Sequence, residues 1–137
     1  VVLEVGACEG YAAAILSLLA GSVVALESDE TLAAAATARL STLGFDNVAV
    51  VTGALEAGYA SEAPYDLIFL NGAVEEVPEA LPAQLLDGGR LVAVTGKGQS
   101  ARATMILRDG KNYSTVRYFN AAIMPLPGFA KAPEFVF

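Results

Sequence analysis

Histidine is missing from this sequence of 137 residues, and cysteine occurs once, at Cys8. Without histidine the chain cannot form a Ser-His-Asp or Cys-His catalytic group, or a histidine-ligated metal site, from its own residues. A single cysteine excludes an internal disulfide, so we expect a cytoplasmic rather than an oxidising environment. These absences argue against the common hydrolases and predict no metal site.

Basic residues are also scarce, because eight lysines and arginines stand against fifteen acidic residues and give a net charge of −7. A nucleic-acid partner would require a basic surface, so we expect none. The uncharged stretch 12–26 is interrupted at Gly21 and is shorter than the roughly 18–20 residues that cross a bilayer, so we expect no membrane association. The basic residues that gather late in the chain are interpreted as solvated strand edges: Lys97, Arg102, Arg108, Lys111 and Arg117.

Hydrophobic residues make up 55% of the sequence, and they fall in short apolar runs that alternate with helical stretches. The predicted strands are 1–5, 23–27, 48–52, 66–70 and 90–95. The predicted helices are 10–20, 29–43 and 78–86, the last with Pro78 in its first turn and 87–89 at its end. This alternation predicts an α/β fold whose parallel strands are joined by right-handed crossovers.

Two further details complete the predicted fold. Helix 29–43 should end at Gly44. It should bury the face formed by Leu32, Ala35, Ala36, Leu40 and Leu43. Strands 104–108 and 113–123, joined by a turn at 109–112, should form a closing antiparallel hairpin. We expect a single domain over 1–137 that begins inside its central strand and lacks an N-terminal segment.

The most informative pattern is the first strand, which stops at Gly6 and is followed by Gly10 and an alanine-rich helix. Such a turn is expected to present free backbone N–H groups, and the positive end of a helix dipole, to a ligand. The second strand ends in Glu27, about 20 residues beyond the first glycine, as in nucleotide sites of the Rossmann kind. The plain alternatives are glycine as strand–helix punctuation and a solvated acid at a strand end.

Other polar residues near the strand ends are less decisive. Asn71 follows the fourth strand, where open α/β sheets place their ligands, and a functional role for it stays open. Glu75 and Glu76 are interpreted as solvated loop acids. Cys8 would sit at a helix N-terminus, but without histidine or a second cysteine it is interpreted as a small residue in a tight turn.

Several segments resemble one family. The chain is similar to the class I S-adenosylmethionine-dependent methyltransferases, and within them to the protein-L-isoaspartate O-methyltransferases. The first glycine motif is generic to that class, whereas the run 63–92, with Pro78 and Gln84 in place, points to the narrower family. The matching segments are 3–6, 10–11, 24–27, 43–44, 47–48, 53, 63–68, 77–81, 84–85 and 87–92, with a weaker match at 123–126.

The resemblance implies S-adenosylmethionine as cofactor and a Rossmann-like sheet that ends in an antiparallel hairpin. It places the turn from Gly6 to Gly10 under the methionine part of the cofactor and assigns the ribose hydroxyls to Glu27. Asn71 and Gly72 would border the reacting methyl group, while no catalytic residue is assigned. The full set of implied cofactor contacts is Glu4, Gly6, Ala7, Gly10, Glu27, Ser28, Gly53, Ala54 and Asn71.

The sequence also departs from the family pattern. Cys8 and Glu9 stand where the family usually has glycine or a small residue, and Glu9 could approach the cofactor's amino group. Ala54 replaces the acid that holds the adenine amino group, for which Glu56 could substitute. The fourth strand is followed by Asn-Gly-Ala instead of Thr-Ala-Ala, and the family's upstream segment with an active-site hydroxyl is not in this sequence.

The resemblance therefore implies methyl transfer to a carboxylate, with L-isoaspartyl residues of damaged proteins as acceptors and a protein or peptide as partner. This chemistry needs no histidine, because a carboxylate is already ionised at neutral pH. The departures leave open a catalytically degenerate module that binds or regulates. A nicotinamide dehydrogenase is a further alternative, against which the terminal hairpin and the missing third glycine both count.

Overall fold

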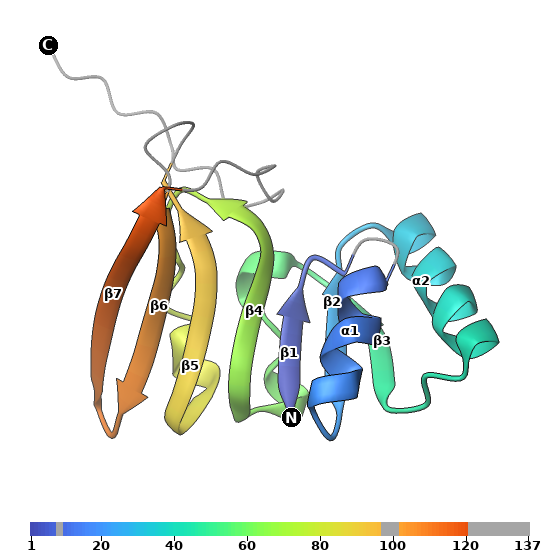
Figure 1. Ribbon diagram of the computed structural model, residues 1–137, viewed down its shortest axis with the longest axis horizontal. Coiled ribbons are helices and arrows are strands. Elements are labelled where there is room, and N and C mark those ends of the chain that lie inside the picture. The colour runs from blue at the N-terminus through green and yellow to red at the C-terminus, as the bar shows by residue number, and fades with distance from the viewer. Residues whose placement is uncertain (8–9, 97–101, 121–137) are drawn as a thin grey trace, which may run out of the picture.

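A computed structural model describes residues 1–7, 10–96 and 102–120, and these form one sheet in the order β3-β2-β1-β4-β5-β6-β7 (Figure 1). Strands β1 to β5 pair in parallel, while β6 and β7 form an antiparallel hairpin. The predicted α/β class and the closing hairpin are confirmed. The strands are β1 (Val2–Val5), β2 (Val23–Glu27), β3 (Val48–Thr52), β4 (Tyr65–Val74), β5 (Leu85–Thr95), β6 (Arg102–Asp109) and β7 (Asn112–Asn120), and the helices are α1 (Tyr11–Leu19) and α2 (Glu30–Leu43).

The central strand β1 divides the core into two layers. Leu3 and Val5 point to one face, where they join a cluster that includes Ile68 and Leu91. Val2 points to the other face and packs beneath α1. Because β1, β2, β4 and β5 are parallel, their carboxyl ends lie at one edge of the sheet, the upper edge in Figure 1.

Within the described residues, no helix is long and apolar enough to cross a membrane.

Helix α2 begins and ends where the sequence predicts. The side chain of Asp29 accepts hydrogen bonds from the N–H groups of Thr31 and Leu32, at 2.8 and 3.2 Å, and so caps the first turn. Gly44 ends the helix with φ of 78°. The predicted buried face is only partly right, because the helix meets β2 and β3 through small side chains and leaves Leu43 60% exposed. The buried residues are Ala33, Ala36 and Leu40.

Helix α1 is apolar all round, but the sheet covers one side of it. Ala13 and Leu16 pack in the cluster beneath the helix. Ile15, Leu18 and Leu19 are 61%, 74% and 83% exposed. The predicted helix 10–20 is therefore confirmed, packed on the sheet along one side and exposed on the other.

The predicted third helix, 78–86, is wrong. Pro82 has no N–H to donate, and its ring would clash with the carbonyl of the residue four positions earlier, Pro78. The segment instead forms a short 3-10 helix, η3 (Pro82–Gln84), and β5 begins at once at Leu85. The sequence Asp87-Gly88-Gly89 therefore lies inside a strand rather than ending a helix.

The hairpin is anchored by the start of β5. The carboxylate of Asp87 accepts the N–H of Gly110 in the hairpin turn at 2.7 Å. The Arg108 side chain donates to the carbonyl of Leu85. The last residues of the predicted second hairpin strand, 121–123, lie outside the described residues.

Gln84, one of the residues that carry the family resemblance, holds a loop together. Its side chain accepts the N–H of Tyr59 at 3.0 Å and donates to the carbonyl of Ala57 at 2.9 Å. These partners lie in and after the 3-10 helix η1 (Leu55–Ala57), which precedes a second one, η2 (Ala60–Glu62). Gln84 is 9% exposed, so its amide replaces water for both backbone groups.

We predict that Gln84→Ala lowers the free energy of unfolding by about 2 kcal/mol, because two backbone groups lose their partner. Urea unfolding followed by circular dichroism measures this change. Glu79→Ala, at an exposed position of the same segment, is the control and should leave stability nearly unchanged. Equal stability of the two variants would contradict a structural role for Gln84.

Candidate functional site

The turn between β1 and α1 is held by the carbonyl of Leu26 at the end of β2. This oxygen accepts the N–H groups of both Gly6 and Ala7, at 2.9 and 3.0 Å. The N–H of Gly10 in turn donates to the carbonyl of Ala7 at 2.9 Å. The expectation that this turn offers free N–H groups is therefore wrong for residues 6, 7 and 10, because the neighbouring strand and the turn itself use them.

What the turn does present is the start of α1. Gly10 is the N-cap residue, with φ of 93° and no side-chain hydrogen bond, and the first intrahelical bond runs from the N–H of Ala14 to its carbonyl. The N–H groups of residues 11–13 therefore have no partner within the helix, as at any helix start. A Cβ at Gly10 would also lie 3.4 Å from Ala36 and Leu40 of α2. Cys8 and Glu9 lie outside the described residues.

Glu4 is the most unusual residue of the site. Its side chain is fully buried, and neither carboxylate oxygen has a hydrogen-bond partner. Its cross-strand neighbours are Ala25 and Phe69, so the carboxyl group faces apolar side chains on both sides. Burial, and secondarily the negative charge of Glu27, raises the pKa of Glu4 to about 8.

Glu27 lies on the same face of the sheet as Glu4. Glu4 stands opposite Ala25 in the parallel ladder, and Glu27 is two residues further along β2. Glu27 is 4% exposed, and its carboxylate accepts the N–H of Asp29 at 3.0 Å. The alternative of a solvated acid at the strand end is therefore wrong, because this side chain is buried and held in place.

The ends of β2 and β3 are joined beside Glu27. The N–H of Gly53 donates to the carbonyl of Glu27 at 3.1 Å. Ser28, Gly53 and Ala54 are all exposed at this edge, so they line its surface without being part of the core. Ala54 has extended backbone and precedes η1, in which Glu56 is exposed.

Asn71 connects β4 to the glycine turn. Strand β4 continues to Val74, so Asn71 and Gly72 lie within the strand and not after it. The pairing of β4 with β5 is irregular between Phe69 and Ala73, around these residues. The Asn71 amide donates to the carbonyl of Gly6 at 3.4 Å, which places this side chain at the turn between β1 and α1.

The structure thus brings most of the predicted site residues to one edge, and it adds a feature that the sequence interpretation missed. Glu75, Glu76, Arg102 and Arg117 line a pocket next to this edge. Glu76, Arg102 and Arg117 are also exposed, as expected for solvated acids and strand edges. Only the strand register, which composition does not reveal, places these residues together.

Over residues 1–127 the sequence matches the family described as protein-L-isoaspartate(D-aspartate) O-methyltransferase. The chain belongs to this family. A relative from Herpetosiphon aurantiacus named protein-L-isoaspartate O-methyltransferase is 38% identical over 135 residues, covering 96% of this chain and 60% of the relative. One of the same name from Methanoregula boonei is 42% identical over 127 residues, covering 93% of this chain and 58% of the relative.

Solved structures share the fold of this chain. A protein-L-isoaspartate O-methyltransferase structure superposes with a TM-score of 0.83 at 30% identity, covering 93% of this chain and 42% of that one. A Plasmodium falciparum protein assigned the same activity, crystallised with S-adenosyl-L-homocysteine, shares the fold with a TM-score of 0.74 at 20% identity, covering 91% and 64% of the two chains. The chain spans about 60% of the length of the family relatives compared above.

Glu4 makes a pH dependence of stability testable. Between about pH 4.5 and 8, Glu4 is protonated in the folded chain and ionised in the unfolded chain, so unfolding releases a proton. Stability should therefore fall as pH rises through this range, by up to about 1.4 kcal/mol per pH unit. We predict that Glu4→Gln removes this loss, so that the variant gains stability over the natural chain as pH rises from 5 to 8.

Urea unfolding at several pH values, without added cofactor, measures the difference. Glu79→Gln, at an exposed position, is the matched control and should follow the pH dependence of the natural chain. Parallel curves for the natural chain and Glu4→Gln would refute the buried, protonated state of Glu4.

Proposed function

We propose that this chain takes part in methyl transfer from S-adenosylmethionine to a carboxylate, with L-isoaspartyl residues of proteins as acceptors. The proposal depends chiefly on one observation: the buried acids Glu4 and Glu27 lie beside the turn from Gly6 to Gly10. Membership of the isoaspartyl methyltransferase family supports methyl transfer over hydride transfer. We further propose a cytoplasmic site of action, in keeping with the single cysteine.

The residues at the edge fit the proposed cofactor. S-adenosylmethionine carries an ammonium and a sulfonium cation at its methionine end. The unpartnered carboxyl group of Glu4 belongs to β1, which leads directly into the turn that would face that end. A cation close to Glu4 would favour its ionised form. The Glu27 carboxylate, fixed by the N–H of Asp29, can accept hydrogen bonds from both ribose hydroxyls.

The chain's part in such a reaction is alignment. When bound, the cofactor supplies a methyl group on sulfur that a carboxylate oxygen can displace. The acceptor is already ionised at neutral pH, so the protein need not remove a proton from it. Asn71, held by the carbonyl of Gly6, and the buried Gly72 form the border of the proposed reaction site. Fixing donor and acceptor in line there is worth several powers of ten in rate.

The direct test uses an isoaspartyl peptide, a peptide of the same sequence with ordinary aspartate, and cofactor labelled in its methyl group. We expect base-labile methyl esters on the isoaspartyl peptide and none above background on the aspartyl peptide. Calorimetry with the cofactor separates two failures: binding without transfer would favour a module that binds or regulates, and absence of binding would exclude the proposal.

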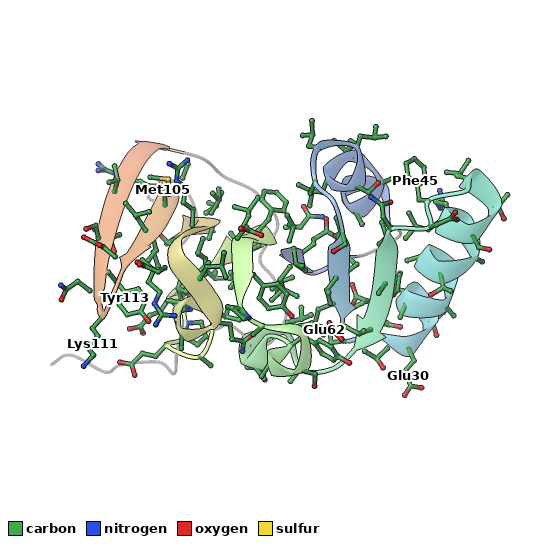
Figure 2. The ribbon with its side chains drawn as sticks, turned by 90° about the horizontal axis from the view of Figure 1, so that it is seen from below. Glu30, Phe45, Glu62, Met105, Lys111 and Tyr113 are labelled. Atoms are coloured by element: carbon green, nitrogen blue, oxygen red, sulfur yellow. The ribbon has the colours of Figure 1, made fainter. Side chains whose placement is uncertain are left out.

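We predict that Glu27→Gln weakens binding of S-adenosylmethionine about tenfold, because a charged acceptor is replaced by a neutral amide. Titration calorimetry measures the dissociation constant. Glu62→Gln makes the same chemical change before the amino end of β4, at the opposite edge of the sheet (Figure 2), and should bind as the natural chain does. If both variants bind equally, Glu27 is not a ribose ligand.

Ala54 offers a test in the opposite direction. The resemblance places an acid at this position, and here the exposed alanine adjoins Gly53, which is tied to Glu27. We predict that Ala54→Asp tightens cofactor binding several-fold, by adding an acceptor for the adenine amino group. Ala57→Asp, at an exposed position three residues on, should have no such effect. Unchanged or weaker binding by Ala54→Asp would place the adenine elsewhere.

A further inference from the structure

A cavity of about 440 Å³ lies between the loop after β4, the end of β5 and the β6–β7 hairpin. We call it the hairpin pocket. It adjoins the carboxyl edge that carries the proposed cofactor site, because β4 and β5 run parallel to β1. The residues that give it its chemical character are Glu75, Glu76, Thr95, Arg102, Thr104 and Arg117.

The strand register explains why one wall of the hairpin pocket is basic. Thr95 of β5 stands opposite Arg102 of β6, and Thr104 of β6 stands opposite Arg117 of β7. Residues directly opposite one another in an antiparallel pair project to the same face. Both arginines therefore lie on the face that carries the larger core cluster, at the place where that core gives way to polar side chains.

The floor of the pocket is held by hydroxyl groups. Thr104 is 3% exposed and donates to the carbonyl of Arg102 at 3.1 Å. Its hydroxyl also lies 2.6 Å from that of Thr95, in a hydrogen bond that joins β5 to β6. These contacts fix the backbone on which Arg102 stands, so the basic wall has a defined position beside the end of β5.

The walls of the pocket differ in charge. Arg102 and Arg117 are exposed on the hairpin side, and within residues 1–7, 10–96 and 102–120 neither makes an ion pair. Glu75 and Glu76 stand on the side of β4. In a chain with net charge −7, two guanidinium groups that line one pocket provide a local site for an anion. The planar guanidinium matches the two oxygens of a carboxylate.

We propose that the hairpin pocket binds the acceptor polypeptide next to the residue to be methylated, with an acidic side chain of that polypeptide held by Arg102 and Arg117. The proposal rests on the proposed function and specifies its substrate class. Strand β4 connects the two sites, because Asn71 reaches the glycine turn and Glu75 follows the last residue of the same strand.

The basic wall of the pocket also selects a direction. An acidic side chain turned toward the hairpin is attracted by Arg102 and Arg117. A polypeptide with one acidic residue near the isoaspartyl group is therefore favoured in one orientation. The volume lies within the range of pockets that hold a ligand in a fixed pose.

The test uses isoaspartyl peptides that differ at one site, with Glu, Gln or Lys placed in turn at three positions on either side of the isoaspartyl residue. Binding is measured by fluorescence anisotropy, and KM and kcat by methyl-ester formation. For the natural chain we expect the Glu peptide to bind about tenfold tighter than the Gln peptide at one position. The double variant Arg102→Gln and Arg117→Gln should abolish this preference by weakening binding of the Glu peptide about tenfold, to the level of the Gln peptide.

The control is the double variant Arg90→Gln and Lys111→Gln, which has the same net charge. Both control residues are exposed and neither lines the pocket, Lys111 being at the far end of the hairpin (Figure 2). Reversal with Arg102→Glu and Arg117→Glu should shift the preference to the Lys peptide. Equal binding of the Glu and Gln peptides by the natural chain at every position would overturn the proposal, as would a preference that survives in the arginine variants. Failure of methyl transfer with the preference intact would count against the proposed function alone.

Discussion

The site depends on how the parallel strands end. The carbonyl of Leu26 would be free at the end of the β2 ladder, yet it accepts two N–H groups of the turn that leaves β1. This is possible because the backbone of Gly6 adopts φ of 90°, a value that residues other than glycine rarely adopt. The turn therefore stays against β2, and α1 covers the face of the sheet to which Glu4 and Glu27 point. The Asn71 amide and the N–H of Gly53 tie β4 and β3 to the same edge.

This arrangement buries the acidic side chain of Glu4 among apolar residues. Alternation along β1 turns Glu4 to the side of Val2, toward the alanine-rich cluster under α1, where an apolar residue would pack without cost. A buried carboxyl group without a hydrogen bond costs about 1–3 kcal/mol even when neutral, and its pKa of about 8 means that it is mostly protonated at neutral pH. Packing therefore does not account for an acid here. Under the proposed function, electrostatic attraction to the cationic methionine end of the cofactor would account for it.

Residue patterns predict much of this fold, because parallel strands are continuous apolar runs and helices are bounded by Asp29, Gly10 and Gly44. The third helix was predicted wrongly. Pro78 is typical of a helix start, but Pro82, four residues later, cannot donate a hydrogen bond and so prevents the helix from continuing. The hydrogen bonds to Leu26 were not predictable, because they depend on the register of β1 with β2. The hairpin pocket depends in the same way on the alignment of three strands, although each of its residues is plain in the sequence.

The proposed cofactor site and the hairpin pocket lie on opposite faces of the sheet. Donor and acceptor would therefore approach the carboxyl edge from different sides. Glu4 and Glu27 face the side of α1, whereas Thr95 and Thr104 continue the face of Leu91 and the larger core cluster. A methyl group passes in line between donor and acceptor, so the two must approach it from opposite directions. Gly72, within β4, is buried and carries no side chain. Under the proposed functions of the two sites, an acceptor held from the hairpin side would approach the carboxyl edge from the face opposite to that of the donor.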